Sequence, residues 1–222
     1  MRKLILSIIA SLLLITTNAM SFSLSDANIS IGVSGNQAAY YAEGKESASK
    51  EDGTVDKTTE EAGAFTDGYG SIFVEVGVND NISIGLDYVP EDIKTPENIS
   101  NEDRSTTTKV SATFSDLMTL YAKINMPLGG TYLKVGLTQV DISINENSSR
   151  TYSQPGDTSG YMAGIGYEKD AGNGVAVRLE VTANSFDDVT SNNGVAASGN
   201  RNVVDVSDMM GARGTLSLVK SF

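Results

Sequence analysis

The end of this chain alternates in polarity from one residue to the next. The apolar positions are Met210, Ala212, Gly214, Leu216, Leu218 and Phe222, and the intervening polar positions include Arg213, Thr215, Ser217 and Ser221. A period of two predicts a β-strand, because successive side chains of a strand point to opposite faces of the sheet. We expect this strand to run to Phe222, with one face in an apolar environment.

Similar alternation in earlier segments gives eight predicted strands in all. Their approximate limits are 28–42, 68–78, 82–89, 107–126, 131–142, 159–168, 174–186 and 204–222. Short turns at 79–81, 127–130 and 169–174 alternate with long polar connections at about 43–67, 90–106, 143–158 and 187–203. A soluble sandwich has no reason to place every short turn at one end, whereas transmembrane barrels do. The pattern predicts an all-β fold, an eight-stranded antiparallel up-and-down transmembrane β-barrel over residues 20–222.

Residues 1–19 have the features of a secretory signal peptide. Arg2 and Lys3 precede an uncharged apolar run, and Thr17-Asn18-Ala19 supplies small residues before a cleavage site. The apolar run is too short for a transmembrane helix, which needs about 20 residues. A membrane location would therefore require a closed barrel, because lipid cannot satisfy an open sheet edge.

The strand predicted at 107–126 indicates which face meets lipid. Its even positions from Val110 to Met126 are apolar apart from Asp116, and its odd positions are mostly polar. At about 2.5 Å of height per residue of a tilted strand, Met118 to Met126 would cover roughly 20 Å, close to the apolar band of such barrels. Asp116 would lie at the outer rim. The predicted lipid-facing residues are Ile72, Val74, Val76, Leu120, Ile124, Leu133, Val135 and Leu179.

The opposite strand faces carry charged residues, which we expect to point into the barrel. They are Glu75, Asp87, Lys109, Lys123, Lys134, Glu168, Arg178, Glu180 and Arg213. An eight-stranded barrel leaves an interior that side chains fill, and buried charges must be paired. All of these residues except Lys109 are assigned to an ion-pair network that plugs the lumen. An active or conducting site is the alternative, and the pairing within the network is left open.

Composition argues against several classes of function. The chain has neither histidine nor cysteine, so the commonest general base and metal ligand and all thiolate chemistry are missing. We expect no catalytic residue, no metal site and no cofactor. A formal net charge of −12 argues against nucleic acid as a partner, because phosphate binding needs clustered Lys and Arg. The acidic connections 43–67 and 90–106 match no calcium loop, and they would form either a solvated surface or a contact surface.

With leader, alternating strands, short turns and terminal Phe222 together, the chain resembles the small OmpA/OmpX-type outer-membrane barrels. The resemblance covers nearly all of the mature chain. It implies recognition of the last strand by the barrel-assembly machinery through Phe222, Leu218 and Leu216, although Lys220 departs from the family's aromatic or apolar residue there. It also implies a non-enzymatic structural, adhesive or surface-defence role in the outer membrane of a Gram-negative bacterium.

The expected partners are outer-membrane lipid, lipopolysaccharide, the assembly machinery, and a host or cell-surface ligand that contacts the acidic loops. One rival class is a narrow porin-like channel for ions or small solutes. A second rival is a soluble β-sandwich or lipocalin-like carrier, which would need a polar outer face and an apolar lumen. The inward positions predicted here are hydroxyl-bearing, amide or charged, so the carrier is disfavoured.

Overall fold

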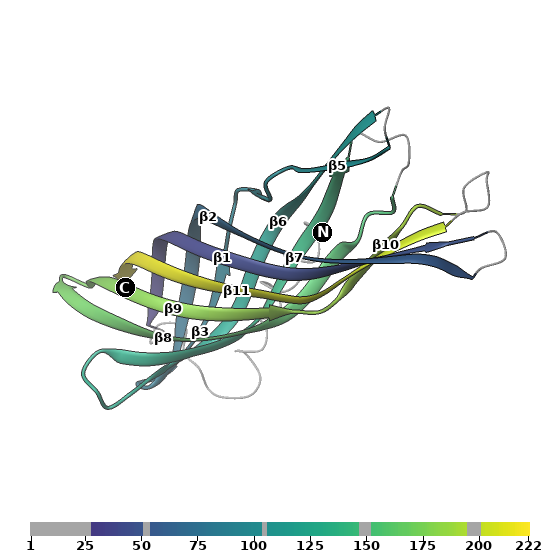
Figure 1. Cartoon of the computed structure of the whole chain (residues 1–222). Helices are drawn as coiled ribbons and strands as arrows, with labels where there is room; N and C mark the ends of the chain where they lie inside the picture. Colours follow the sequence, from purple (N-terminus) through teal and green to yellow (C-terminus); the bar gives the residue numbers. More distant parts are fainter. Residues whose placement is uncertain (1–27, 51–53, 104–105, 147–151, 195–200) are drawn as a thin grey trace.

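The computed structural model (Figure 1) describes residues 28–50, 54–103, 106–146, 152–194 and 201–222. The predicted leader 1–19 lies outside the described residues. The described backbone is all β, with an 11-stranded sheet. In this part of the chain no helix is long and apolar enough to cross a membrane.

Eight strands form a closed antiparallel ring. They are β1 (Ile29–Ser49), β2 (Val55–Asn79), β3 (Ile82–Tyr88), β6 (Thr106–Asn125), β7 (Thr131–Glu146), β8 (Gly156–Gly172), β9 (Val175–Phe186) and β11 (Arg201–Ser221). Each pairs with the next, and β11 pairs back with β1, where Val33 lies opposite Leu218. The predicted eight-stranded antiparallel barrel is therefore confirmed. Three short strands lie outside the ring: β4 (Ile93–Lys94) and β5 (Asn98–Asp103) pair with β6, and β10 (Val189–Asn192) pairs with β11.

The short turns close the end of the barrel that also holds Ile29 and Phe222, in agreement with the sequence pattern. The Phe222 backbone N–H donates to the Ile29 carbonyl at 2.9 Å, so the first and last strands meet there. In the turn between β8 and β9, Asn173 has φ of 56° and Gly174 φ of 69°. These are left-handed conformations that Asn and Gly tolerate best, which explains the Asn-Gly pair at a tight hairpin.

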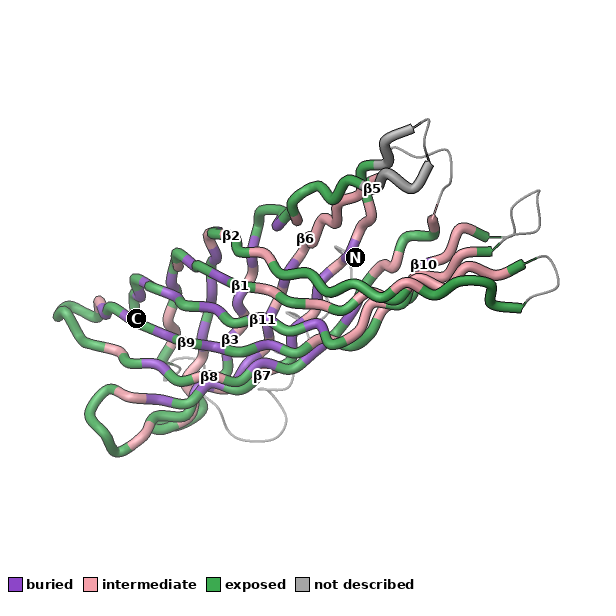
Figure 2. Tube along the Cα trace, in the orientation of Figure 1, coloured by how far each residue is buried: buried purple, intermediate pink, exposed green. Residues whose placement is uncertain are grey.

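At the other end the strands run far beyond their predicted limits. The sequence predicts a polar loop at 43–67, but β1 continues to Ser49 and β2 starts at Val55, with Lys45 directly opposite Glu60. β7 and β11 likewise enter the predicted connections 143–158 and 187–203. In these outer extensions the residues of both faces are exposed or partly exposed (Figure 2). Because neither face needs apolar residues, the sequence there shows no alternation, although the backbone still pairs with its neighbour.

A β-bulge reverses the facing of β6 at its outer end. Asp116 has φ of 53°, and the register with β7 shifts between Ser115 and Met118. An extra residue in one strand moves every side chain beyond it to the other face. Phe114 consequently packs inside the barrel, and Lys109 is an exposed residue paired with Glu97. The predictions that the even-numbered residues from Val110 to Met126 share one outward face, and that Lys109 points inward, were wrong for this reason.

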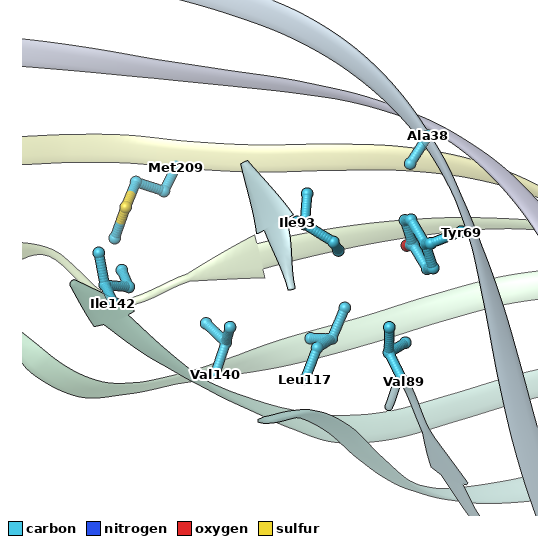
Figure 3. Packing of buried hydrophobic residues seen from close by; sticks show 8 residues of the cluster. All are labelled: Ala38, Tyr69, Val89, Ile93, Leu117, Val140, Ile142 and Met209. Carbon is cyan, nitrogen blue, oxygen red and sulfur yellow. The ribbon is translucent and has the colours of Figure 1, made fainter. Parts of the chain in front are cut away.

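The chain after β3 turns into the barrel instead of forming an outer loop from its first residue. Val89 and Ile93 are 1% and 2% exposed, and they join a buried apolar cluster with Ala38, Tyr69, Leu117, Val140, Ile142 and Met209 (Figure 3). The Val89 backbone N–H donates to the Leu117 carbonyl at 3.0 Å, which holds the segment against β6. The predicted loop 90–106 therefore begins as a plug in the outer half of the lumen.

The outer face of the ring is apolar. Along β9, Leu179 is 58% exposed while Arg178, the residue before it, is 2% exposed. The eight residues predicted to face lipid are all exposed or half-exposed on strands whose alternate residues are buried. This inverted pattern, apolar outside and polar inside, fits a wall surrounded by hydrocarbon.

Candidate functional site

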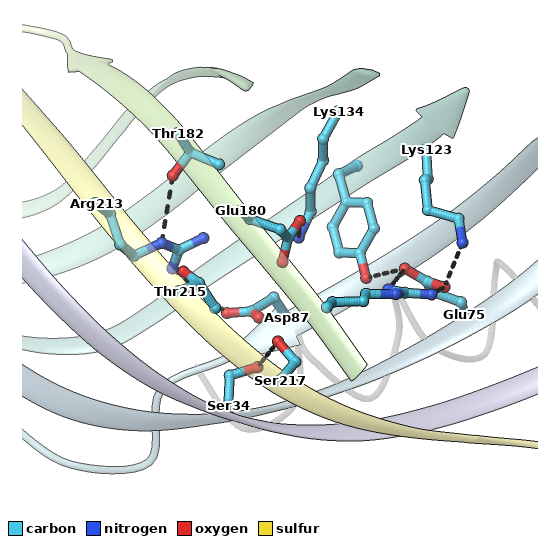
Figure 4. Close-up of polar contacts among 12 residues, drawn as sticks. Ser34, Glu75, Asp87, Lys123, Lys134, Glu180, Thr182, Arg213, Thr215 and Ser217 are labelled. Atoms are coloured by element: carbon cyan, nitrogen blue, oxygen red, sulfur yellow. Dashed lines mark hydrogen bonds and ion pairs between the residues drawn. The ribbon is translucent and has the colours of Figure 1, made fainter. Parts of the chain in front are cut away.

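The side chains in the half of the lumen near the short turns form a charged cluster centred on Glu75 (Figure 4). Arg178 donates from Nη1 to Glu75 Oε1 and from Nη2 to Oε2, both at 2.6 Å. The Tyr121 hydroxyl donates to Oε1 at 2.7 Å, and Lys123 Nζ lies 3.7 Å from Oε2. Two parallel N–H···O bonds are the strongest arrangement of a guanidinium with a carboxylate, so strands β2 and β9 are tied across the lumen.

A second carboxylate, Glu168, completes this cluster. It accepts from Arg178 Nε and from Lys123 Nζ, the latter at 3.4 Å. Its side chain is 31% exposed, whereas those of Glu75, Arg178 and Lys123 are at most 8% exposed. Two cations and two carboxylates therefore neutralise one another, and only one of the four reaches solvent.

Two further ion pairs lie beside this cluster in the lumen. Lys134 Nζ is 3.1 Å from Glu180 Oε1, and Arg213 Nη1 is 3.7 Å from Asp87 Oδ1. Glu180 Oε1 makes no hydrogen bond of good geometry with any described residue, so this pair is held by charge alone. Asp87 also accepts a hydrogen bond from Ser71 at 3.2 Å. All eight residues of the predicted network thus take part in ion pairs, in three separate groups.

Inward-pointing aromatic rings lie across glycines of neighbouring strands. Phe73 is opposite Gly32, Tyr121 opposite Gly85, and Tyr132 opposite Gly166. A Cβ added at these glycines would lie 2.1, 2.4 and 2.2 Å from the nearest ring atom. Only a residue without a side chain leaves room for a ring that lies flat against the wall. The rings then face the cations: Lys134 Nζ is 3.9 Å from the Tyr121 ring centroid, and Arg178 Cζ is 5.1 Å from that of Phe73.

The outer half of the lumen is filled differently. The buried cluster around Val89 and Ile93 is apolar, and stacked rings extend it outward: Tyr40 and Phe65 at 5.1 Å between centroids, and Phe65 and Phe114 at 6.1 Å. The interior therefore has two layers in series, a paired polar layer near the short turns and an apolar layer near the outer strands.

The charged side chains of the outer strands are mostly acidic. Glu46 accepts hydrogen bonds from Asn202 Nδ2 at 2.8 Å and from the Tyr152 hydroxyl at 3.3 Å. Partial burial is the main cause that raises the pKa of Tyr152 above its usual value, and the Glu46 carboxylate adds to the effect. Asp141 lies directly opposite Asp157 across β7 and β8. Among the described residues, no group of three or more carboxylates is arranged to hold a metal ion.

Sequence reasoning located the lumen charges but missed the aromatic residues between them and the plug segment. The alternation on each strand assigns an inward face, which is enough to find Glu75, Arg178 and the other ionisable groups. The alternation does not say which residues lie opposite each other on neighbouring strands, so nothing in the sequence indicated that Tyr121 lies opposite Gly85. Leu216, Leu218 and Phe222, which the sequence predicts to be an assembly signal, are 56%, 53% and 74% exposed on the outer face of β11 and at its end.

Comparison with known proteins agrees with this architecture. Residues 7–202 match the family described as outer membrane protein beta-barrel domain. No curated protein matches the sequence.

Among solved structures, the outer membrane protein OprG from Pseudomonas aeruginosa is similar with a TM-score of 0.54, at 12% identity, over 87% of this chain and 95% of that chain. The outer membrane protease OmpT from Escherichia coli gives 0.48 at 12% identity, over 93% of this chain and 100% of that chain. Neisserial surface protein A gives 0.39 at 12% identity, over 86% and 97%. At such identity the likeness to OprG concerns the fold alone.

Proposed function

The chain belongs to the outer membrane protein beta-barrel domain family, and from that premise we propose that it is a non-enzymatic surface protein whose barrel is a closed anchor. Its location is the outer membrane. The outer strands would present a binding surface for adhesion or defence at the cell exterior. Transport through the barrel would be no part of its function.

The observation that carries this proposal is the filled lumen. Glu75, Arg178 and Lys123 pair in the inner layer, and Val89 and Ile93 occupy the outer layer. Eight strands leave an interior just wide enough for such side chains. A channel would require both layers to move, and neither layer contains an uncompensated charge that favours an ion passing through.

The length of the outer strands supports the binding role. From Gln37, the first polar outward residue of β1, to Ser49 there are twelve residue steps, or about 40 Å along the strand at ~3.3 Å per residue. The paired strands β1, β2, β11 and β10 continue as a sheet in this region (Figure 1). A sheet that projects this far beyond the lipid-facing wall adds nothing to closing the barrel, so its surface supports a role in contact with other molecules.

Catalysis has little support in the chemistry of the site. The chain contains no histidine, and the buried carboxylates Glu75, Asp87 and Glu180 each have a cation within 4 Å. A general base needs an unpaired lone pair near its substrate and a pKa near the operating pH. Pairing with Lys or Arg works against both requirements.

The experiment uses the full-length protein and a variant with a shortened hairpin. Because Gly44 lies opposite Glu61, residues 45–60 are replaced by an Asn-Gly turn, which preserves the register below. We expect both proteins to be silent in a planar bilayer, and only the full-length protein to make a non-adherent laboratory bacterium bind cultured epithelial cells. Discrete current steps from the full-length protein would overturn the closed anchor and favour the narrow channel. Equal adherence of both strains would overturn the role of the outer strands.

Export and assembly are part of the same proposal. Residues 1–19 would direct export and then be removed. The assembly machinery would recognise Phe222, Leu218 and Leu216. The finished barrel would contact lipid and lipopolysaccharide. Lys220 fits this scheme, because its Nζ donates to the Asn173 carbonyl at 2.6 Å at the adjacent turn instead of facing hydrocarbon. Deletion of Phe222 should reduce the amount of folded protein in the outer membrane. Unchanged levels, measured by unheated gel mobility, would contradict the assembly role.

A further inference from the structure

The outer part of β2 has one edge that no strand of the described residues covers. β2 pairs with β1 along its whole length, but its pairing with β3 ends where Ile72 meets Tyr88. Beyond that point the chain after β3 enters the lumen, and Glu91 Oε1 accepts a hydrogen bond from the Gly70 N–H at 2.6 Å. Farther out, between residues 58 and 66, no backbone hydrogen bond to this side of β2 occurs within the described part of the chain.

Two other exposed strand edges in the outer region are bridged by a neighbouring segment. Gln154 both donates to and accepts from the Ile144 backbone, at 3.1 and 2.6 Å, and so covers the edge of β7. Ser153 donates its N–H to the Asn192 carbonyl at 2.7 Å and covers the edge of β10. An uncovered edge is a template for another strand, and proteins usually protect such edges. The outer edge of β2 has no such bridge among the described residues.

The register shows which residues present their backbone to that edge. The Gly77 N–H donates to Asn28 on the β1 side, whereas the N–H groups of Gly68 and Gly70 bond elsewhere. In an antiparallel pair, alternate residues direct both backbone groups to the same side. The even-numbered residues of β2 therefore direct their backbone N–H and C=O groups away from β1, toward the open edge. Among them, Ala62 and Ala64 have small, exposed side chains. Their small side chains leave room for a backbone that approaches there.

The charge of β2 favours some partner strands over others at this edge. Between Val55 and Gly68 there are four carboxylates, Asp56, Glu60, Glu61 and Asp67, and one lysine, Lys57, which leaves a net charge of −3. Glu60 and Asp56 already pair with Lys45 and Lys50 at 3.3 and 2.8 Å, and Glu61 and Asp67 have no ion-pair partner among the described residues. A second copy of the same edge would bring like charges together, which is unfavourable for strand pairs. A basic strand would bring opposite charges into the cross-strand positions.

We propose that the free edge of β2 between Thr58 and Thr66 binds an extended segment of another protein that is rich in lysine or arginine, by adding it to the sheet as a strand. Backbone hydrogen bonds would supply the pairing and the acidic side chains the preference for basic sequence. This inference rests on the proposed function, because it names the partner chemistry and the binding mode of the same outer sheet.

The test uses the full chain in nanodiscs of zwitterionic lipid, so that a basic peptide has no anionic lipid to bind. The probe is a labelled peptide of about twelve residues that alternates lysine and threonine, with two relatives: one N-methylated at alternate residues, and one with glutamate in place of lysine. We expect fluorescence anisotropy to give about tenfold weaker binding for both relatives. Equal binding of the N-methylated peptide would overturn strand addition, and equal binding of the glutamate peptide would overturn the charge preference.

Variants of the protein provide the complementary comparison. Ala62→Pro with Ala64→Pro removes two outward N–H donors without touching the pairs with β1, and should weaken binding of the lysine peptide about tenfold. Ala62→Ser with Ala64→Ser keeps both donors and should bind like wild type. Unchanged binding by a proline variant of native gel mobility would overturn the assignment to this edge. The N-methylated peptide tests the same claim on the unaltered protein if the proline variant does not fold.

The two proposals fail separately. If the wild-type protein does not bind the lysine peptide while adherence still depends on residues 45–60, only the edge inference is overturned. If the wild-type protein binds the lysine peptide but adherence does not depend on residues 45–60, the proposed function is overturned instead. Cross-linking that joins two copies through β2 would show a second copy as the occupant and would overturn the basic partner.

Discussion

Replacement of Glu75 by glutamine is the most informative change in the lumen. Glu75 receives two hydrogen bonds from Arg178 at 2.6 Å and one from Tyr121 at 2.7 Å, and its side chain is 3% exposed. Glutamine keeps the shape and one acceptor oxygen but has no charge. Arg178 and Lys123 would then share Glu168 as their remaining carboxylate partner among the described residues.

The cost follows from leaving buried positive charge uncompensated. Loss of one partner of a buried ion pair typically costs ~3–5 kcal/mol. Because Glu168 is 31% exposed and still compensates part of the charge, we expect the lower end of that range, about 3 kcal/mol. A matched surface change is Glu97→Gln, which breaks a pair with Lys109 at 2.9 Å between side chains that are 59% and 47% exposed. That change should cost about 0–1 kcal/mol.

The measurement is urea unfolding of each variant in lipid vesicles, with the folded fraction read from unheated gel mobility. The free energy of unfolding should fall for Glu75→Gln and remain nearly constant for Glu97→Gln. If Glu75→Gln lay within about 1 kcal/mol of wild type, water would have to solvate Arg178 and Lys123. The dry, filled lumen would then be refuted, together with the closed anchor that rests on it.

Three other changes test the wall of the barrel. Leu120→Arg places a charge on the lipid face and should lower the unfolding free energy by ~2–4 kcal/mol if Leu120 lies near the midplane; an unchanged refolding equilibrium would contradict its facing. Gly85→Ala puts a Cβ 2.4 Å from the Tyr121 ring and should cost about 1–3 kcal/mol, whereas the same change made in a Tyr121→Leu background should cost much less than it does in the wild type. Asp141→Asn removes the repulsion from Asp157 and should stabilise by roughly 0.2–1 kcal/mol at low salt, with the gain shrinking in concentrated salt; a salt-independent effect would point to another cause.

Sequence alone determined the class of fold and which side chains lie on the outer and inner faces of each regular strand. A period of two in the chain is a direct consequence of strand geometry, so neighbouring residues such as Leu179 and Arg178 are assigned to opposite faces by their positions in the chain. The short turns rich in Asn, Gly and Pro determined the number of strands. The ionisable residues of the lumen followed from the same alternation, because a charge on a strand with an apolar outer face has only the inner face left to occupy.

Tertiary structure alone decided the length of the strands, their facing beyond a bulge, and the partners of each side chain. Polar residues on both faces of β1 and β2 gave no alternation, although their backbones pair to Ser49 and Val55. At Asp116 one extra residue reversed the face on which Phe114 lies, and no local pattern distinguishes a bulge from a regular strand. The ion pair of Glu75 with Arg178 joins residues 103 positions apart. Such a contact depends on the register of every strand between them, which closure of the ring determines and a periodic pattern cannot.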